Sequence, residues 1–296
     1  MGAATAPPDH DRAVPPGPVL VTGGDGQLGR ELVAAAARVD RPLVALGRRE
    51  LDVADAGSIH AACAAIDPAA IIHAAAWTDV DGAEASEQAA AAINDTGTRL
   101  VVAEAARLDI PVVAVSTDYV FPGDAPQGYV EDDEPAPQGA YGRTKRAGEL
   151  HVLDYERGLV ARTAWLFSEH GSNFVRTMDV LTRSREAVDV VADQVGSPTW
   201  ARHLADALLA CLDRELTGIV HLAGEPAVSW HGLAQAVVDA NGSGCEVRPV
   251  GTEAFPRPAP RPACSILRST RPDAPVVGPW ADGVRAVVRA WELART

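Results

Sequence analysis

The sequence predicts an α/β fold built on a doubly wound parallel sheet. Short apolar runs alternate with helical stretches from Val19 to Phe167, which is the pattern of strands joined by covering helices. The apolar runs are continuous, as expected for strands that are buried on both faces. A glycine-rich segment directly follows the first apolar run. Together these observations indicate a Rossmann-type fold.

Five apolar runs in this part are predicted to be strands, at residues 19–22, 42–46, 70–75, 112–116 and 159–165. Helices are predicted between them, at residues 28–38, 58–66, 86–107 and 141–156. After Phe167 the alternation is looser, with helices expected at 174–185, 201–212 and 230–240 and extended segments at 188–191 and 219–223. Five prolines between residues 248 and 262 predict that this stretch has no regular structure.

These patterns predict a division of the chain into three parts. Residues 1–17, rich in proline and alanine, are expected to be a disordered tail. Residues 18–167 and 200–225 are expected to form the Rossmann domain. Residues 168–199 and 226–296 are expected to form a smaller, irregular α/β domain that binds the substrate, because ligands usually lie in clefts between such parts.

The formal net charge of −14 argues against nucleic acid as a partner, because a phosphate backbone requires a basic surface. No apolar run reaches the ~18 residues that a membrane-spanning helix needs, and the N-terminus lacks the features of a signal peptide. We therefore expect a cytoplasmic protein without membrane contact. Four distant cysteines without a CxxC pair predict buried or incidental thiols rather than a zinc site: Cys63, Cys211, Cys245 and Cys264.

Three glycines with the spacing GxxGxxG lie between the first strand and the first helix: Gly23, Gly26 and Gly29. The first permits a tight turn, the second lets the backbone approach a pyrophosphate, and the third lets the helix pack closely on the strand. The helix N-terminus then offers unpaired N–H groups and a partial positive charge. This segment is predicted to bind the phosphates of a dinucleotide.

The segment after the second strand is expected to meet the adenosine ribose, and it reads LGRR at residues 46–49. An acidic residue there would bind a ribose 2′-hydroxyl, whereas an arginine suits a 2′-phosphate. Arg48 therefore favours NADPH, with NADH as the alternative. The other interpretation is that Arg48 and Arg49 are ordinary exposed loop charges. Asp52 and Val53 follow closely and are expected to flank the adenine.

Tyr141 and Lys145 form a YxxxK motif, and residues four apart on a helix share a face. Reduction of a carbonyl by hydride needs a proton for the developing alkoxide, which a tyrosine can supply. A free tyrosine has a pKa of ~10, and a neighbouring ammonium lowers this pKa by stabilising the phenolate. Lys145 can also hold the nicotinamide ribose. Behind a glycine-rich turn, this pair indicates a carbonyl reductase that uses a nicotinamide cofactor.

The end of the fourth predicted strand carries two hydroxyl residues, Ser116 and Thr117. The carboxyl edge of a parallel sheet is where ligands bind in open α/β folds. A hydroxyl there can donate a hydrogen bond to the substrate carbonyl, or it can simply cap the strand end. The position predicts a third catalytic residue, and on this argument both hydroxyls remain candidates.

Six segments resemble the dTDP-4-dehydrorhamnose reductases, a family of the extended short-chain dehydrogenase/reductase group. In chain order they are TGGDGQLG, STDYVF, YGRTK, RTAWLF, DQVGSPT and RPACS. The likeness extends from about Val19 to Val288. STDYVF and DQVGSPT together are specific to this branch, whereas the glycine-rich turn and YxxxK occur far more widely.

The resemblance implies NADPH-dependent reduction of the C4 keto group of a dTDP-4-keto-6-deoxyhexose, with dTDP-L-rhamnose as the product. Tyr141 would protonate the C4 oxygen, Lys145 would tune Tyr141 and bind the ribose, and Thr117 rather than Ser116 would hydrogen bond the keto group. The cofactor would be lined by Gly23, Gly26, Gln27, Leu28, Asp52, Val53, Ala76, Trp77 and Thr78. The substrate would be contacted by Thr117, Asp118, Trp165, Asn173, Phe174 and Arg261. Without the resemblance, Trp165 would be interpreted as a core residue.

One departure from the family concerns a metal-supported dimer. Bacterial members form a dimer with a magnesium ion held by carboxylates, and Glu31 stands at the first such position. The helix after DQVGSPT begins with WARH at residues 200–203, without the other acids. We therefore expect no bound metal, and a monomer or a weak homodimer.

Two alternative functions remain open on the sequence. Similar motifs occur in 4-ketoreductases for other dTDP-deoxysugars of antibiotic biosynthesis, such as dTDP-dihydrostreptose. The motifs separate neither these sugars nor the C4 configuration of the product. The second alternative is a non-catalytic regulatory subunit of this fold, like that of methionine adenosyltransferase. The intact Thr117, Tyr141 and Lys145 argue against it.

Overall fold

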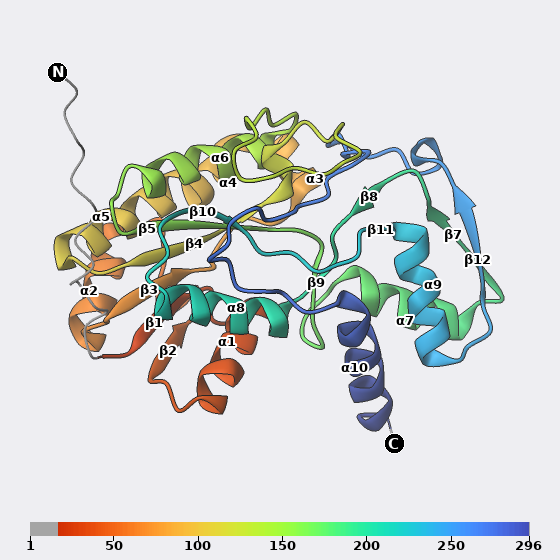
Figure 1. Cartoon of the computed structure of the whole chain (residues 1–296), viewed down its shortest axis with the longest axis horizontal. Coiled ribbons are helices and arrows are strands. Elements are labelled where there is room, and N and C mark those ends of the chain that lie inside the picture. Colours follow the sequence, from red (N-terminus) through yellow and green to blue (C-terminus); the bar gives the residue numbers. More distant parts are fainter. Residues whose placement is uncertain (1–16, 296) are drawn as a thin grey trace.

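A computed structural model describes residues 17–295 (Figure 1). The tail predicted for residues 1–17 lies, apart from Gly17, outside the described residues. Six parallel strands form the central sheet, in the order β10-β5-β4-β3-β1-β2. They are β1 Val19–Thr22, β2 Leu43–Leu46, β3 Ala70–His73, β4 Val112–Thr117, β5 Gly158–Thr163 and β10 Gly218–His221. The strand order reverses between β1 and β3, where open α/β sheets form their ligand crevice.

Helices cover both faces of this sheet (Figure 1). α1 (Gln27–Arg38) and α8 (Ala201–Asp213) pack on one face. α2 (Ala56–Ile66), α5 (Thr98–Leu108) and α6 (Ala140–Leu153) lie on the other. The predicted doubly wound α/β fold is therefore confirmed.

Alternate residues of each strand point to opposite faces of a sheet. In β1, Val19 and Val21 belong to the core under α1 and α8, whereas Leu20 belongs to the core under α2 and α5. All three side chains are buried. Burial on both faces explains why the strand reads as a continuous apolar run.

The helix predicted at residues 86–107 is interrupted by a change of helix type. α4 (Glu87–Ala91) leads into a π-helical segment, η1 (Ala92–Gly97), and α5 follows directly. Apolar residues recur across the break, so periodicity gave no sign of it. π-Helical turns are frequent at functional sites. The short helix α3 (Val80–Ala85) precedes α4, and a 3-10 turn, η2 (Asp118–Val120), follows β4.

A second apolar core lies beside the sheet (Figure 1). Its main elements are α7 Phe174–Ser184, β7 Ala187–Val191, α9 Trp230–Asn241, β12 Glu246–Val250 and α10 Trp280–Leu293. β7 and β12 pair in parallel. Two short strand pairs complete this part: β6 (Leu166–Phe167) with β9 (Thr199–Trp200), and β8 (Val195–Gly196) with β11 (Val228–Ser229).

The expectation of no regular structure at residues 248–262 is wrong for the first three of them. β12 includes Arg248 and Pro249, and it pairs with β7 along one edge only. An edge strand tolerates proline because the missing N–H can face away from the partner strand. A 3-10 turn, η3 (Thr252–Ala254), follows. The sequence prediction also lacks helix α10.

No helix in the described part of the chain is both long and apolar enough to cross a membrane. All four cysteines are free, and Cys63, Cys211 and Cys245 are buried. Burial raises the pKa of Cys63 to about 11 and that of Cys211 to about 12. Both remain protonated thiols at neutral pH, in agreement with the prediction of buried thiols.

Candidate active site

The glycine-rich turn lies between β1 and α1, and its backbone requires two of the glycines. Gly23 has a φ of +75°, in the left-handed region that favours glycine. A Cβ on Gly29 would lie 2.5 Å from the Gly23 carbonyl oxygen, so no larger residue fits there. α1 starts after Gly26 without a side-chain cap among the described residues. Its first N–H groups are therefore available to an anion.

The predicted adenosine side of the site is partly exposed. Arg48 is exposed and forms no ion pair within residues 17–295. Asp52 accepts a 3.0 Å hydrogen bond from Ala54 N. The side chains of Leu28 and Val53 are buried in the two cores of the sheet, so these two residues offer a cofactor chiefly their backbone groups.

Asn94, which the sequence prediction missed, connects the predicted cofactor loop at Trp77 with helix α6. Its Oδ1 accepts a 2.8 Å hydrogen bond from Trp77 N. Its Nδ2 donates to the Trp77 carbonyl (3.2 Å) and to the Thr144 hydroxyl (3.1 Å). Asn94 is buried within η1. The one sequence feature that could have indicated its role is an amide side chain within an apolar helical pattern. Through this side chain, the segment of Ala76, Trp77 and Thr78 is tied to the turn that carries Lys145.

Thr117, Asp118 and Tyr141 meet at the carboxyl end of β4. The Thr117 hydroxyl donates to Asp118 Oδ1 (3.0 Å) and accepts from Tyr119 N (3.2 Å). Burial raises the pKa of Tyr141 to about 12; a hydrogen bond with Thr117 lowers this pKa and the Asp118 charge raises it. Tyr141 therefore holds its proton firmly at neutral pH in the absence of a ligand.

Asp118 is a buried carboxyl group beside this tyrosine. Burial raises its pKa to about 6, and hydrogen bonds from Ser265 and Thr117 oppose the shift. Its Oδ2 has no hydrogen-bond partner among the described residues. A buried acceptor without a hydrogen bond destabilises the folded protein unless a ligand donates a hydrogen bond to it.

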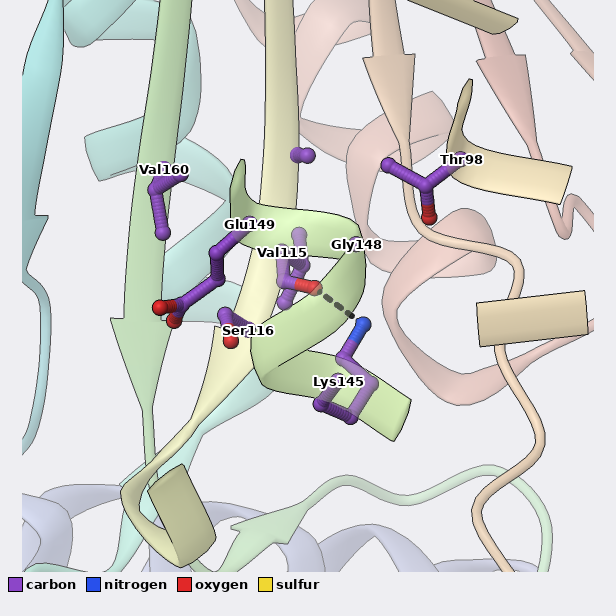
Figure 2. Close-up of a pocket in the computed structure, with 8 residues that line it drawn as sticks. Thr98, Val115, Ser116, Lys145, Gly148, Glu149 and Val160 are labelled. Carbon is purple, nitrogen blue, oxygen red and sulfur yellow. Dashed lines mark hydrogen bonds between the residues drawn. The ribbon is translucent and has the colours of Figure 1, made fainter. Parts of the chain in front are cut away.

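Lys145 lies one helical turn after Tyr141 on α6, and its Nζ donates a 2.7 Å hydrogen bond to the Val115 carbonyl (Figure 2). Burial lowers the pKa of Lys145 to about 8, and the Glu149 carboxylate opposes this shift. Glu149, one further turn along α6, accepts hydrogen bonds of 2.9 and 2.8 Å from the fully buried guanidinium of Arg162. Tyr141, Lys145 and Glu149 thus follow one another along one face of the helix.

Ser116, the other candidate hydroxyl, faces a different space. It lines a small cavity behind Lys145 together with Glu149 and Thr98 (Figure 2). Thr117, by contrast, acts on Tyr141, because its hydroxyl lowers the pKa of that phenol. The geometry therefore favours Thr117 over Ser116 as the third residue of the site.

A larger cavity of about 660 Å³ is lined by residues of both the sheet domain and the second core. Tyr119 lines it, and its ring stands edge-on to that of Tyr141, with the centroids 5.6 Å apart. The predicted substrate residues Phe174 and Arg261 also line it. Arg261 forms a 2.9 Å ion pair with Asp81 of α3. The volume is that of a small-molecule site.

Four predicted substrate residues do not line this cavity in the described part of the chain: Thr117, Asp118, Trp165 and Asn173. Asn173 caps α7, accepting from Arg176 N at 2.9 Å, and donates a 2.9 Å hydrogen bond to Gln27 Oε1. A predicted substrate residue thus holds a predicted cofactor residue. Trp165 has a φ of +46° and stacks on Trp230, with centroids 3.4 Å apart and an interplanar angle of 6°. Trp230, which does line the cavity, was missed by the sequence prediction.

Glu31 lies near two groups that the sequence did not connect with it. One ligand atom of each of Glu31, Glu169 and His170 lies within 4.8 Å of the others. Burial raises the pKa of Glu31, while the charges of His170 and Arg202 lower it. Acidic clusters are common without an ion, and this one alone identifies no metal site. His203 instead stands edge-on to the ring of Trp200.

One class of dinucleotide-dependent oxidoreductases combines three features. These are a doubly wound sheet, a helix N-terminus whose N–H groups are available, and a tyrosine and a lysine one helical turn apart. The fold and the site define a member of the short-chain dehydrogenase/reductase class. Within that class, a family model described as the RmlD substrate binding domain matches residues 17–292. The chain belongs to this family, and the resemblance inferred from the motifs is confirmed.

Comparisons with individual proteins agree with this assignment. A probable dTDP-4,6-dihydroxy-2-methyloxan-3-one 4-ketoreductase of Streptomyces antibioticus is 43% identical over 282 residues, covering 93% of this chain and 92% of that protein. A dTDP-4-dehydrorhamnose reductase of Mycobacterium tuberculosis is 41% identical over 284 residues, covering 93% and 90%. The crystal structure of dTDP-4-dehydrorhamnose reductase from Bacillus anthracis in complex with NADP is similar with a TM-score of 0.89 at 33% identity, covering 93% of this chain and 99% of that chain.

Proposed function

We propose that this chain reduces the C4 keto group of a dTDP-linked 4-keto-6-deoxyhexose with NADPH, giving dTDP-L-rhamnose from dTDP-4-dehydrorhamnose. The observation that carries the proposal is the position of Tyr141, whose ring packs against Tyr119 of the 660 Å³ cavity, with Lys145 one turn further along α6. Relatives that are about 40% identical over nearly the whole chain support the substrate class; two of them are named dTDP-4-dehydrorhamnose reductase and dTDP-4-keto-6-deoxy-D-glucose reductase.

The residues present fit a dinucleotide. Gly23 and Gly29 bring the backbone of the turn close to the start of α1, and no side chain in the described residues occupies the cap position. The N–H groups there would hold the pyrophosphate. Arg48, which is exposed and has no ion-pair partner within residues 17–295, would bind a 2′-phosphate, and this supports NADPH over NADH. The complex of the Bacillus anthracis reductase with NADP agrees with this choice.

Bound NADPH would supply the hydride that reduces the keto carbon. Tyr141 would give its proton to the developing C4 alkoxide, because its phenol is protonated at neutral pH. Lys145 would leave the Val115 carbonyl for the nicotinamide ribose, and its ammonium would then stabilise the phenolate. Thr117 would turn its hydroxyl from Asp118 to the keto oxygen, and the unpaired Oδ2 of Asp118 would accept from a sugar hydroxyl.

A second candidate function is supported by one specific comparison. The Streptomyces antibioticus relative, at 43% identity, is a probable 4-ketoreductase for another dTDP-sugar. The same tyrosine, lysine and threonine would serve that reaction. The two candidates differ in the sugar that the cavity accepts.

We further propose that the enzyme works in the cytoplasm as a monomer or a weak homodimer. Arg202 and His203 stand where the metal-supported dimer would need acidic residues, and this substitution supports the proposal. Light scattering of the purified protein, with and without a chelator, tests the oligomeric state. A stable dimer that the chelator dissociates would contradict it.

The function is tested by supplying several dTDP-4-keto sugars with NADPH and following the loss of NADPH absorbance. The proposal predicts turnover with dTDP-4-dehydrorhamnose, and NMR of the product then gives the configuration at C4. Turnover only with a differently substituted dTDP-4-keto sugar would favour the second candidate. Absence of turnover with every dTDP-4-keto sugar would contradict both.

A further inference from the structure

Trp165 is held in a strained position between two neighbours. Its φ of +46° lies in the left-handed region, which a bulky residue occupies only when its surroundings require it. One neighbour is Trp230, whose ring is parallel to that of Trp165 at 3.4 Å. The other is Gly196, where a Cβ would lie 2.5 Å from Trp165 Cε2, 2.7 Å from Cζ2 and 2.8 Å from Nε1.

These distances show that Gly196 and Trp230 cover opposite faces of the Trp165 ring. If the Cβ position of Gly196 lay in the ring plane, beside the edge, it would be nearer to Cζ2 and Nε1 than to Cε2. It is nearest to Cε2, as expected for a position above the ring face. A point between the two stacked rings would be closer to Trp230 than to Trp165, yet no Trp230 atom is among the three nearest. Among residues 17–295, Trp165 therefore has a neighbour on each ring face, which leaves the ring edge for a ligand.

Trp230, in contrast, lines the 660 Å³ cavity. Phe174 lines it too, with its ring centroid 4.6 Å from that of Trp230 and the planes tilted by 53°. We call the two rings, those of Phe174 and Trp230, the aromatic corner. The indole Nε1 of Trp230 is already used, because it donates a 3.2 Å hydrogen bond to Gln194 Oε1. Gln194 is fixed in turn by a 2.9 Å hydrogen bond to Thr252. The corner thus offers a ligand no free polar group of its own.

The aromatic corner lies near the reacting end of the cavity. β5 pairs with β4 so that Thr163 is the partner of Thr117, and Trp165 follows two residues later. Stacking on Trp165 places Trp230 next to that strand end. The cavity continues past the corner, where apolar residues such as Leu181, Val188 and Val190 and charged ones such as Arg185, Arg257 and Arg261 line it.

We propose that Trp230, with Phe174, binds the C6 methyl group of the 6-deoxyhexose and so selects a 6-deoxy sugar over its 6-hydroxy analogue. This inference rests on the proposed function, because it assigns one end of the same cavity. A C6 hydroxyl placed between the two rings would lose its water and gain no hydrogen bond from either ring, since the indole N–H is occupied. An apolar pocket rejects an added hydroxyl by up to ~100-fold, so that a preference of roughly tenfold is expected.

The experiment compares two ligands that differ only at C6, dTDP-6-deoxy-D-glucose and dTDP-D-glucose. Their dissociation constants are measured by calorimetry on the NADP-saturated protein, together with that of dTDP alone. The variants are Trp230→Ala and the milder Trp230→Phe, which keeps an aromatic ring if the alanine variant fails to fold. Trp200→Phe is the matched control, because Trp200 does not line the cavity in the described residues and its Nε1 is a buried group without a partner.

Wild type and Trp200→Phe are expected to prefer the 6-deoxy ligand by about tenfold. In Trp230→Ala that preference is expected to fall to within about twofold, and in Trp230→Phe to an intermediate value. The affinity for dTDP alone should stay unchanged in all variants. An unchanged preference in both Trp230 variants would overturn the inference. The inference would also be overturned if the Trp230 variants lost as much affinity for dTDP alone as for the dTDP-sugars. That result would mean that Trp230 contacts the thymine base rather than the sugar. If the wild type bound none of the three dTDP ligands, the proposed function itself would be contradicted.

Discussion

The ammonium of Lys145 donates a 2.7 Å hydrogen bond to the carbonyl of Val115, a residue of the strand that ends at Thr117. This contact ties helix α6 to strand β4, with Tyr141 one turn away on the same helix. The bond is to a neutral acceptor, so a ribose hydroxyl can replace it without leaving a buried charge unpaired. The ammonium is therefore held close to the position at which the proposed reaction needs it.

Replacement of Tyr141 by phenylalanine tests the proton donor. The variant keeps the ring and loses only the phenol hydroxyl. We expect kcat to fall by ~10²–10⁴-fold, the usual contribution of a positioned acid. Tyr119→Phe is the matched control, because Tyr119 lines the same cavity beside Tyr141 and should retain most of the activity. Full turnover by Tyr141→Phe, measured from NADPH consumption, would show that another group gives the proton.

The pH dependence of kcat/KM should be bell-shaped in the free enzyme. Burial raises the pKa of Asp118 to about 6, so its carboxylate is lost as the pH falls through that value. Burial lowers the pKa of Lys145 to about 8, so its ammonium is lost as the pH rises through that value. Both charged forms coexist between these limits, where we expect the maximum.

Single variants separate the two limbs of this profile. Asp118→Asn should abolish the acid limb and keep the basic one, because only the carboxylate titrates there. Lys145→Met should abolish the basic limb and lower kcat/KM throughout. A profile of Asp118→Asn identical in shape to that of the wild type would mean that Asp118 is not the group that titrates near pH 6.

Arg48 should decide the preference between the two nicotinamide cofactors. Arg48→Ala should lower the ratio of kcat/KM for NADPH to that for NADH by at least ~10-fold, since a hydrogen bond to a charged group contributes ~1.5–3 kcal/mol. Arg49→Ala, the exposed neighbour, is the control and should change the ratio less. An unchanged ratio in Arg48→Ala would make its guanidinium an ordinary surface charge.

The buried pair of Glu149 and Arg162 should matter for stability. Both side chains are almost fully buried, so Glu149→Gln leaves the Arg162 charge without its carboxylate. We expect a loss of ~3–5 kcal/mol in the free energy of unfolding. The exposed pair of Glu87 and Arg143 offers a control, in which Glu87→Gln should cost only ~0–1 kcal/mol. Urea unfolding measures the loss in the free energy of unfolding for both variants. Equal losses would contradict the expectation that a buried ion pair contributes more to stability than an exposed one.

The sheet could be predicted closely because its strands differ so clearly in composition from their surroundings. β1 occupies the predicted residues, and the end of β4 differs by one residue, at Thr117. The glycine turn and the YxxxK pair are local patterns, so their places on a turn and on a helix could also be predicted. Pro249 misled the prediction, because edge position rather than residue type decides whether a strand tolerates proline.

The parts that could not be predicted depend on contacts between distant residues. The hydrogen bond of Asn173 to Gln27 joins residues 146 positions apart. The stacking of Trp230 on Trp165 depends on how α9 packs beside the sheet, which periodicity does not determine. The π-helical turn at Asn94 is linked to the backbone of Trp77 in a separate loop, and the helical pattern gives no sign of that contact.

The most direct test of the central claim follows the hydride itself. NADPH with deuterium at the transferable position is incubated with the enzyme and dTDP-4-dehydrorhamnose, and the product is examined by NMR. We expect one deuterium at C4 of the sugar, one NADPH consumed for each sugar reduced, and a loss of this transfer in Tyr141→Phe. NADPH consumption without deuterium at C4 of the sugar would contradict this expectation.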